Sequence, residues 1–282
     1  MCGLCGFTGE IIDRDAVLEN MTEVITHRGP DSKGFYTDDK ISMGFRRLSI
    51  IDLDNGSQPI YNEDKTLVLM FNGEIYNYKQ LRKELQEKGH VFATDTDSEV
   101  LVHGFEEWRE DLLNRLRGMF GFAIWNRTDE SLFIARDFFG IKPMHYTQVG
   151  GHFLYASEIK SILKFPGFEK KFNYRTLDNY LSFQYAVPPE TFFEGVYCLL
   201  PGHYLWYRDG KVETTRYWEA RFNPDESLTE EQAVDEIEKV FEESVNAHKI
   251  SDVEVGCFLS SGVDSSYVST YFADQKTFTA VS

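Results

Sequence analysis

The spacing of apolar and polar positions predicts many short strands and few helices in the first 210 residues. Apolar runs predict strands at 67–71, which leads into Asn72-Gly73, and at 121–125, 131–136, 151–157 and 202–208. Apolar side chains at helical spacing predict helices at 15–26, 78–88 and 98–116. Asp13 or Asp15 would cap the first helix, and Gly89 would end the second. The pattern favours an antiparallel α+β architecture.

The pattern changes after Tyr217. Residues 222–227 are polar and contain Pro224, which is typical of a linker. Ser227 with Glu230, or Thr229 with Gln232, forms a capping box. The helix that follows is expected to bury Val234, Ile237, Val240 or Phe241, and Ser244 or Val245. A strand at 253–259, a small-residue loop at 260–264, a helix at 265–272 and a strand at 277–281 then predict the opening of a parallel α/β unit.

Composition indicates a soluble globular protein of about two domains, since 42% of the 282 residues are hydrophobic and 27% are charged. The 46 acidic and 29 basic residues give a net charge of −17, which disfavours binding to nucleic acid or to a membrane surface. Cys2, Cys5, Cys198 and Cys257 are too few for a disulfide scaffold, and the N-terminus lacks a signal-peptide pattern. We therefore expect a reduced, cytoplasmic protein.

Cys2 is the most informative residue. Removal of Met1 would place its thiol beside its own α-amine, so that one residue carries both a nucleophile and a general base. Cys2-Gly3-Leu4-Cys5 is also a CxxC pattern, which is found in redox pairs and in half of a zinc site. Cys198 and Cys257 are isolated, however, and no histidine stands at ligand spacing from them. A chain terminus whose cysteines have no function is the third interpretation.

Several motifs occur in an order that resembles the class II glutamine amidotransferase domain, the Ntn-type glutaminase. They are MCG at the N-terminus, HRGPD at 27–31, RLSIID at 47–52, FNGEIYN at 71–77 and DTDSE at 95–99. The continuation RDFFGIKP at 136–143 and ASEIK at 156–160 is similar to glutamine-dependent asparagine synthetases of the B type. The resemblance implies an α+β fold: an Ntn-hydrolase-type αββα sandwich with two antiparallel sheets, followed by the first elements of a parallel α/β PP-loop ATPase domain.

The same resemblance assigns roles. Cys2 would be the nucleophile and form a γ-glutamyl thioester, while Asn72 and Gly73 would form the oxyanion hole. Arg47 would bind the α-carboxylate of glutamine, and Asp97 with Glu74 its ammonium group. For Arg47 and Asp97 the alternative is an ordinary surface ion pair. The remaining residues of the glutamine site would be Leu48, Ser49, Ile50 and Ile51. His27 and Arg28 would order a loop and take no part in the chemistry.

Residues 259–266 resemble the PP-loop of ATP pyrophosphatases, an anion-binding loop between a strand and a helix. The resemblance implies ATP contacts at Leu259, Ser260, Gly262, Asp264, Ser265 and Val281, with Asp264 also binding Mg²⁺. Ser261 replaces a glycine of the pattern, which would cause strain if its φ were positive. An ordinary Ser/Gly turn is the alternative.

These inferences predict a glutaminase domain at 2–217, a linker at 218–227 and an incomplete synthetase domain at 228–282. The predicted reaction is that of glutamine-dependent asparagine synthetase, in which ATP, L-aspartate, L-glutamine and water give AMP, diphosphate, L-asparagine and L-glutamate. Because the rest of the ATP and aspartate sites would lie beyond Ser282, we expect a C-terminally truncated chain that keeps only the glutaminase half-reaction.

The expected ligands are L-glutamine for this chain, and L-aspartate, ATP and Mg²⁺ for the full-length enzyme. No organic prosthetic group, nucleic acid or membrane is expected, and a homodimer is compatible with the resemblance. Three alternatives stay open: a catalytically silent module that binds glutamine or a partner, an amidotransferase acting on another carboxylate, and a redox or zinc-binding CxxC protein.

Overall fold

A computed structural model describes residues 1–53, 56–272 and 275–280. The chain divides into two compact units, which are described separately. The first comprises Met1–Ser49 and Asp54–Glu219, and the second comprises Ile50–Leu53 and Ala220–Ser282.

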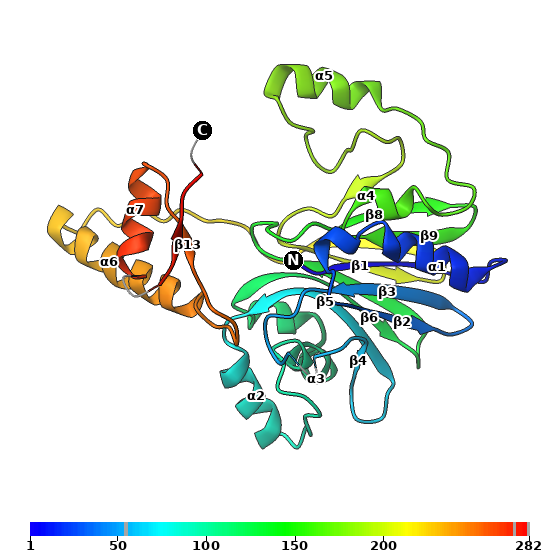
Figure 1. Cartoon of the computed structure of the whole chain (residues 1–282), viewed down its shortest axis with the longest axis horizontal. Helices are drawn as coiled ribbons and strands as arrows, with labels where there is room; N and C mark the ends of the chain where they lie inside the picture. Colours follow the sequence, from blue (N-terminus) through cyan, green and yellow to red (C-terminus); the bar gives the residue numbers. More distant parts are fainter. Residues whose placement is uncertain (54–55, 273–274, 281–282) are drawn as a thin grey trace. The chain divides into compact units, whose positions relative to one another are not determined.

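Two six-stranded antiparallel sheets form the described part of the first unit (Figure 1). One has the order β10-β8-β9-β1-β3-β2. Its strands are β1 (Gly3–Thr8), β2 (Ser32–Thr37), β3 (Ile41–Arg47), β8 (His145–Val149), β9 (His152–Ala156) and β10 (Tyr197–Cys198). The other has the order β12-β11-β7-β6-β5-β4. Its strands are β4 (Ile60–Tyr61), β5 (Leu67–Ile75), β6 (Gly118–Asn126), β7 (Ser131–Arg136), β11 (His203–Arg208) and β12 (Lys211–Arg216).

Helices cover the outer faces of both sheets. α1 (Arg14–Glu23) and α4 (Ile159–Ile162) pack on the first sheet, and α2 (Tyr78–Glu87) and α3 (Glu99–Trp108) lie on the side of the second. The unit also contains η1 (Thr26–Arg28), η2 (Arg109–Asn114) and α5 (Tyr174–Phe183). The inner faces of the sheets share a core that includes Leu4, Phe45, Met70 and Trp125. This α+β arrangement of two antiparallel sheets between helices confirms the predicted fold class.

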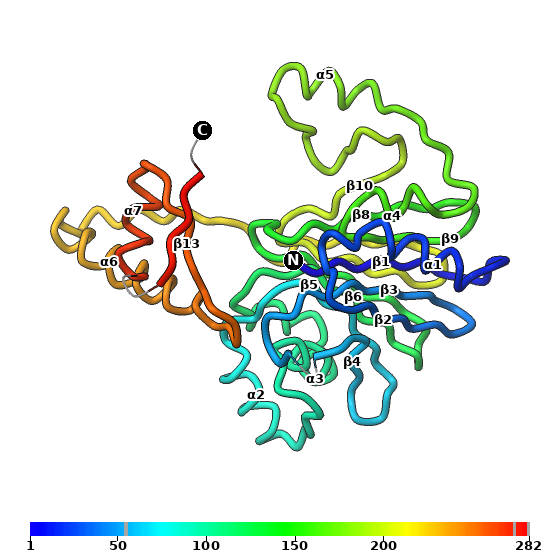
Figure 2. The backbone as a smooth tube through the Cα atoms, in the orientation of Figure 1, coloured from blue at the N-terminus to red at the C-terminus, as the bar shows by residue number. Residues whose placement is uncertain are grey.

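The backbone path, drawn as a tube in Figure 2, differs locally from the predicted elements. The predicted helix at 98–116 breaks at Arg109, whose φ of 51° ends α3, and the chain continues as η2. Gly89 follows α2 with a φ of 105°, as expected of a residue that ends a helix. Asp13 is the N-cap residue of α1, but its side chain makes no capping hydrogen bond. β5 does not end before Asn72-Gly73 but runs through both residues.

The second unit contains α6 (Glu230–Ala247), β13 (Cys257–Phe258), α7 (Val263–Thr270) and β14 (Thr277–Phe278) among its described residues. β13 and β14 pair in parallel, as the α/β prediction requires. Thr229 and Gln232 form the capping box of α6, whereas the Ser227 hydroxyl donates to Asp225 instead.

The predicted buried face of α6 is largely wrong. Val234, Ile237 and Val240 are 56%, 65% and 63% exposed. Phe241 is half-buried and packs against a small cluster, and Val245 is buried. The physical reason is a lack of covering structure, because the described part of this unit offers α6 few apolar partners: the buried Cys257 and Phe272 and the partly buried Val255, Val268 and Tyr271.

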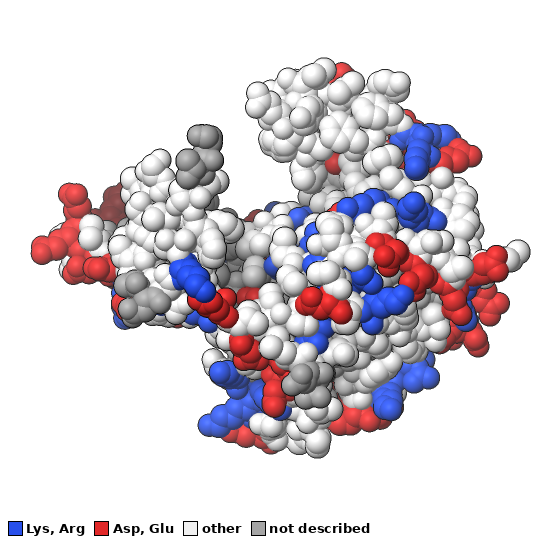
Figure 3. Space-filling view, viewed as in Figure 1, with Lys and Arg blue, Asp and Glu red and all other residues white. Residues whose placement is uncertain are grey.

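Charges of both signs are interspersed on the visible face of the described residues (Figure 3). Within those residues, no helix is both long and apolar enough to cross a membrane.

Candidate active site

Cys2 lies directly before β1, a strand flanked by β9 and β3 in the first sheet. Its thiol is half-buried and contacts the backbone of Leu48, whose N–H donates to Sγ at 3.3 Å. The Arg28 Nε donates to the Cys2 carbonyl at 2.8 Å. The start of β1 is therefore held by two segments that the HRGPD and RLSIID motifs supply.

Burial raises the pKa of the Cys2 thiol, and nearby positive charge opposes this effect. The contact with Leu48, the N-terminal ammonium group, Arg47 and Lys142 all lower that pKa, but burial dominates. The thiol is consequently a weak acid in its resting state, and its activation needs a base.

The end of β3 and the residue after it lie next to the thiol, which contacts the Leu48 backbone. Arg47 is the last residue of β3, is 7% exposed and pairs in register with Ser32 of β2. The Ser49 N–H donates to an Asp31 carboxylate oxygen at 2.8 Å, which joins the RLSIID and HRGPD motifs. Ile50 and Ile51 belong to the second unit, where the Ile50 carbonyl accepts from the Asp252 N–H at 3.1 Å.

Asn72 and Gly73 lie within β5, opposite Gly121 and Phe120 of β6. Asn72 is 1% exposed, and its Nδ2 has no hydrogen-bond partner among the described residues. A buried amide donor without a partner costs stability, so its retention is typical of a group that serves a ligand. The strand β5 also contacts β1, the strand that follows Cys2.

Gly73 is required by the packing of the sheet. A Cβ at this position would lie 2.1 Å from the Met119 carbonyl oxygen and 2.8 Å from the Phe120 Cα, both of which are backbone atoms that cannot move away cheaply.

We expect Gly73→Ala to lower the free energy of unfolding by about 1–3 kcal/mol or more, because the added methyl group collides with β6. The measurement is urea unfolding followed by circular dichroism. Gly121→Ala is the matched control, since a Cβ there would meet its nearest neighbour at an ordinary 3.5 Å. Equal stability of the two variants would contradict this account of Gly73.

Asp97 lies just before α3 and is 6% exposed. One carboxylate oxygen accepts from the Ile75 N–H, at the end of β5, at 2.8 Å. Burial, with a further contribution from the charge of Glu74, raises the pKa of Asp97 from 3.8 to about 7. The Asp97 and Glu74 carboxylates therefore repel each other where burial removes Asp97 from water, and a bound cation would stabilise their ionised forms.

Two anchors of the site were not recognised from the sequence. Lys142 is 4% exposed; burial lowers its pKa, and the charges of Glu74 and Cys2 oppose that shift. Glu158 accepts from Arg28 at 3.1 Å and from His27 at 2.8 Å. Although burial opposes its ionisation, hydrogen bonds from Lys160, His27 and Arg28 lower the pKa of Glu158 to about 2. The only signals for these residues were the RDFFGIKP and ASEIK motifs, which by themselves indicate no role in the site.

The CxxC interpretation is wrong. Cys5 lies within β1 and Cys2 directly precedes it, and the two side chains pack in different clusters on opposite sides of the sheet. Cys2 packs against the core between the sheets, whereas Cys5 packs on the α1 side with its Sγ 3.5 Å from the Thr22 hydroxyl. Burial raises the pKa of Cys5 to about 12, which makes it an inert thiol. The two sulfurs cannot form a redox pair or share a metal ion.

Residues 259–262 lie between β13 and α7 in the second unit, because α7 begins at Val263, two residues before the predicted helix start at 265. The Ser260 and Ser265 hydroxyls are 2.8 Å apart, and the Gly262 N–H donates to the Ser260 hydroxyl at 3.2 Å. Ser261 does not have a positive φ, so the serine causes no strain there. Leu259 donates its N–H to Phe278 of β14, and Asp264 is exposed in the first turn of α7. Val281 lies outside the described residues.

Comparison with known families gives two matches. Residues 1–218 match the glutamine amidotransferase domain, and residues 236–282 match the asparagine synthase family.

Among curated proteins, the asparagine synthetase [glutamine-hydrolyzing] 1 of Bacillus subtilis is 42% identical over 274 residues, which cover 94% of this chain and 43% of that protein. The amidase chyE of Penicillium rubens is 35% identical over 95% of this chain and 39% of that protein. The chain thus spans less than half the length of these relatives.

Among solved structures, a glutamine phosphoribosylpyrophosphate amidotransferase from B. subtilis gives a TM-score of 0.56 at 16% identity. That match covers 99% of this chain and 65% of the other. The allosteric regulatory enzyme of purine biosynthesis gives a TM-score of 0.58 at 17% identity, with the same coverage. At these identities the likeness concerns the fold.

Proposed function

The chain belongs to the glutamine amidotransferase domain family, and from this premise we propose that its first unit hydrolyses the side-chain amide of L-glutamine. The observation that carries the proposal is the place of Cys2. It is the second residue of the chain, directly before β1, and its thiol accepts a hydrogen bond from the Leu48 N–H. The positive charges of Arg47 and Lys142 act to lower the pKa of this thiol. Removal of Met1 would add a free α-amine to the same residue.

In the proposed reaction the Cys2 sulfur attacks the side-chain carbonyl carbon of glutamine, and the thiol proton passes to the α-amine. The tetrahedral oxyanion accepts hydrogen bonds from the Asn72 side chain and the Gly73 N–H. Collapse breaks the C–N bond, and the α-ammonium returns a proton to the departing ammonia. Water then opens the γ-glutamyl thioester to give glutamate and restore the thiol.

Substrate recognition would use charges at the two ends of the amino-acid group. The Arg47 guanidinium suits the α-carboxylate, because its planar fork can donate two parallel hydrogen bonds. Asp97 and Glu74 suit the ammonium group, because a cation between the two carboxylates would relieve the charge repulsion that contributes to the raised pKa of Asp97. Leu48 and Ser49 would complete the proposed glutamine site in the first unit, and the adjoining Ile50 and Ile51 belong to the second unit.

The raised pKa of Asp97 predicts pH-dependent glutamine binding. Folding favours its protonated form up to about pH 7, whereas an ammonium ligand favours the carboxylate. Affinity should therefore rise about tenfold per pH unit as the pH increases towards 7 and level off above it. Calorimetric titration of Cys2→Ala protein, which cannot turn glutamine over, measures this.

Two variants in the Cys2→Ala background sharpen that measurement. Asp97→Asn should bind weakly with a flat pH profile. Asp95→Asn is the matched control, because the Asp95 side chain in the same motif is 90% exposed and pairs with Arg82. A flat profile in protein that retains Asp97 would contradict the assignment.

For the second unit we propose the opening of a synthetase domain, which places the glutaminase domain at 2–217, the linker at 218–227 and the incomplete synthetase domain at 228–282. The match of residues 236–282 to the asparagine synthase family supports this, as do the small hydroxyls and backbone N–H groups between β13 and α7. Leu259, Ser260, Gly262, Asp264 and Ser265 would contact ATP, as would Val281. The exposed Asp264 offers the single carboxylate that Mg²⁺ commonly takes beside phosphate oxygens.

The overall reaction proposed for the full-length enzyme is the transfer of ammonia from glutamine to aspartate through an acyl-adenylate. We propose a cytoplasmic location, which the four free cysteines favour, and a homodimeric assembly. Release of glutamate from glutamine tests the glutaminase. Tight glutamine binding without release would instead select the silent module, and the identity of the amidated acceptor would separate aspartate from another carboxylate.

A further inference from the structure

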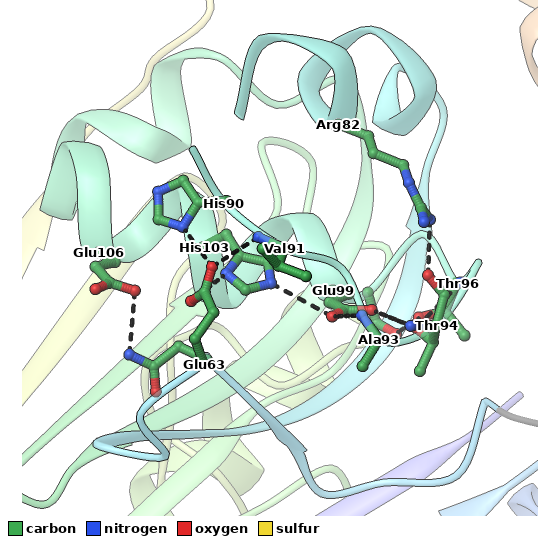
Figure 4. A network of polar contacts seen from close by, with 12 residues as sticks. Glu63, Arg82, His90, Val91, Ala93, Thr94, Thr96, Glu99, His103 and Glu106 are labelled. Carbon is green, nitrogen blue, oxygen red and sulfur yellow. Dashed lines mark hydrogen bonds and ion pairs between the residues drawn. The ribbon is translucent and has the colours of Figure 1, made fainter. Parts of the chain in front are cut away.

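We propose that Glu63, His90, His103 and Glu106 form a binding site for a divalent transition metal ion such as Zn²⁺, separate from the Cys2 site. Each residue offers one ligand atom, and these atoms all lie within 4.8 Å of one another. Glu63 lies between β4 and β5, His90 follows α2, and His103 and Glu106 lie one turn apart on α3. Figure 4 shows that the four side chains converge from these three segments.

The orientation of both imidazoles is the main argument. Nδ1 of His90 lies 3.1 Å from one oxygen of Glu63, and Nδ1 of His103 lies 3.2 Å from the other. On the opposite side of each ring, Nε2 lies 3.3 Å from a second carboxylate. The His103 Nε2 is hydrogen-bonded to Glu99, whereas the His90 Nε2 faces Glu107 without a hydrogen bond in the described structure. When one ring nitrogen of a histidine binds a metal ion, a carboxylate commonly accepts a hydrogen bond from the other ring nitrogen.

Glu99 determines the tautomer of His103. It is 1% exposed, and it already accepts from the Ala93 N–H at 2.6 Å and the Thr94 N–H at 2.7 Å. An ionised carboxylate only accepts, so the His103 Nε2 must donate to it, which leaves a lone pair on Nδ1.

That Nδ1 atom is an unsatisfied group. His103 is 1% exposed, and its Nδ1 makes no hydrogen bond in the described structure although a Glu63 oxygen lies 3.2 Å away. A lone pair facing a carboxylate is unfavourable unless a cation lies between them. One metal ion satisfies both rings at once.

The ligand set also suits a divalent ion in charge and size. Two carboxylates and two neutral imidazoles neutralise a 2+ charge, and nitrogen with oxygen ligands suits zinc. Zinc bonds of about 2.1 Å require ligand atoms to be no more than about 4.2 Å apart. Bringing the ligand atoms from 4.8 Å to that distance would need a small shift of the exposed Glu63 and Glu106 side chains. The Asn62 Nδ2 already orients Glu106 with a 3.1 Å hydrogen bond to Oε2.

Equilibrium dialysis with ZnCl₂, followed by elemental analysis, tests the site. Cys2→Ala protein is used throughout, so that the half-buried thiol does not compete. We expect one zinc per chain and a rise in melting temperature on adding zinc. His90→Gln, His103→Gln and Glu63→Gln should each weaken binding at least tenfold, and Glu99→Gln about 10–100-fold. His248→Gln, an exposed histidine of α6's C-cap, is the matched control and should change nothing.

The same proteins with CoCl₂ give a second readout. A nitrogen and oxygen site should produce the visible absorption of tetrahedral cobalt without a cobalt–thiolate band, and His90→Gln should remove that absorption. Because Glu63 is exposed, Glu63→Gln separates loss of a ligand from loss of folding. Absence of stoichiometric zinc binding, or zinc binding that the His90 and Glu63 substitutions leave unchanged, would overturn the proposal.

Discussion

Replacing Cys2 by alanine should lower glutaminase turnover by about 10⁴-fold or more, because no other group can form the thioester. Burial raises the pKa of this thiol, so the reaction depends on a base delivered to the same residue. Activity should therefore be proportional to the fraction of chains from which Met1 has been removed. Glutamate release measures the rate, and mass spectrometry of the intact protein measures both the processed fraction and the γ-glutamyl adduct.

Cys198→Ala is the control for this experiment. Cys198 is a free, half-buried thiol of the same unit, so the variant should keep its turnover. If fully processed Cys2→Ala protein releases glutamate at the original rate, the proposed function fails. The zinc site would be unaffected by that result, because none of its ligands takes part in the proposed chemistry.

Asn72→Ala should lower kcat by about 10²–10³-fold, the usual cost of losing one oxyanion donor. Its stability should change by only about 1 kcal/mol, because the buried Nδ2 has no partner in the described structure and its removal leaves nothing newly unsatisfied. Rate assays and urea unfolding on the same preparation test both statements. A purely structural asparagine would show the reverse pattern, with a large loss of stability and little change in kcat.

Asn126→Ala on the neighbouring strand β6 is the matched control. The Asn126 side chain accepts from the Thr128 N–H at 2.9 Å and belongs to a turn. This variant should keep its kcat. Glutamine affinity, measured in the Cys2→Ala background, should be nearly the same whether or not the Asn72→Ala substitution is added, since the oxyanion exists only during the reaction.

The sequence predicted the fold class because its ordered motifs and strand lengths agree with one architecture. It offered Thr229 with Gln232 as one of two capping boxes and predicted the end of α2 at Gly89, because both features depend on neighbours within about four residues. It did not predict that β5 continues through Asn72-Gly73, since that pair usually indicates a turn. The backbone of β6 decides this, because only a glycine leaves room for the Met119 carbonyl.

The electrostatic state of the site also depends on the tertiary structure. Asp97 has a pKa of about 7 because distant strands and helices remove it from water beside Glu74, and nothing in the DTDSE motif indicates that. The positive charge of Lys142 acts to lower the pKa of Cys2, although the two residues are 140 positions apart in the chain. The Glu63–His90–His103–Glu106 cluster likewise joins residues of three separate segments.

The sequence by itself determined which reactive groups are available: a thiol at position 2, an arginine at 47, an amide at 72 and a carboxylate at 97. The tertiary structure decided which of them are buried, which charges face them and which stay without a partner. The physical reason is one of range. Residue type and local conformation depend on chemistry within a few positions, whereas desolvation and charge interactions depend on what the fold packs around each group.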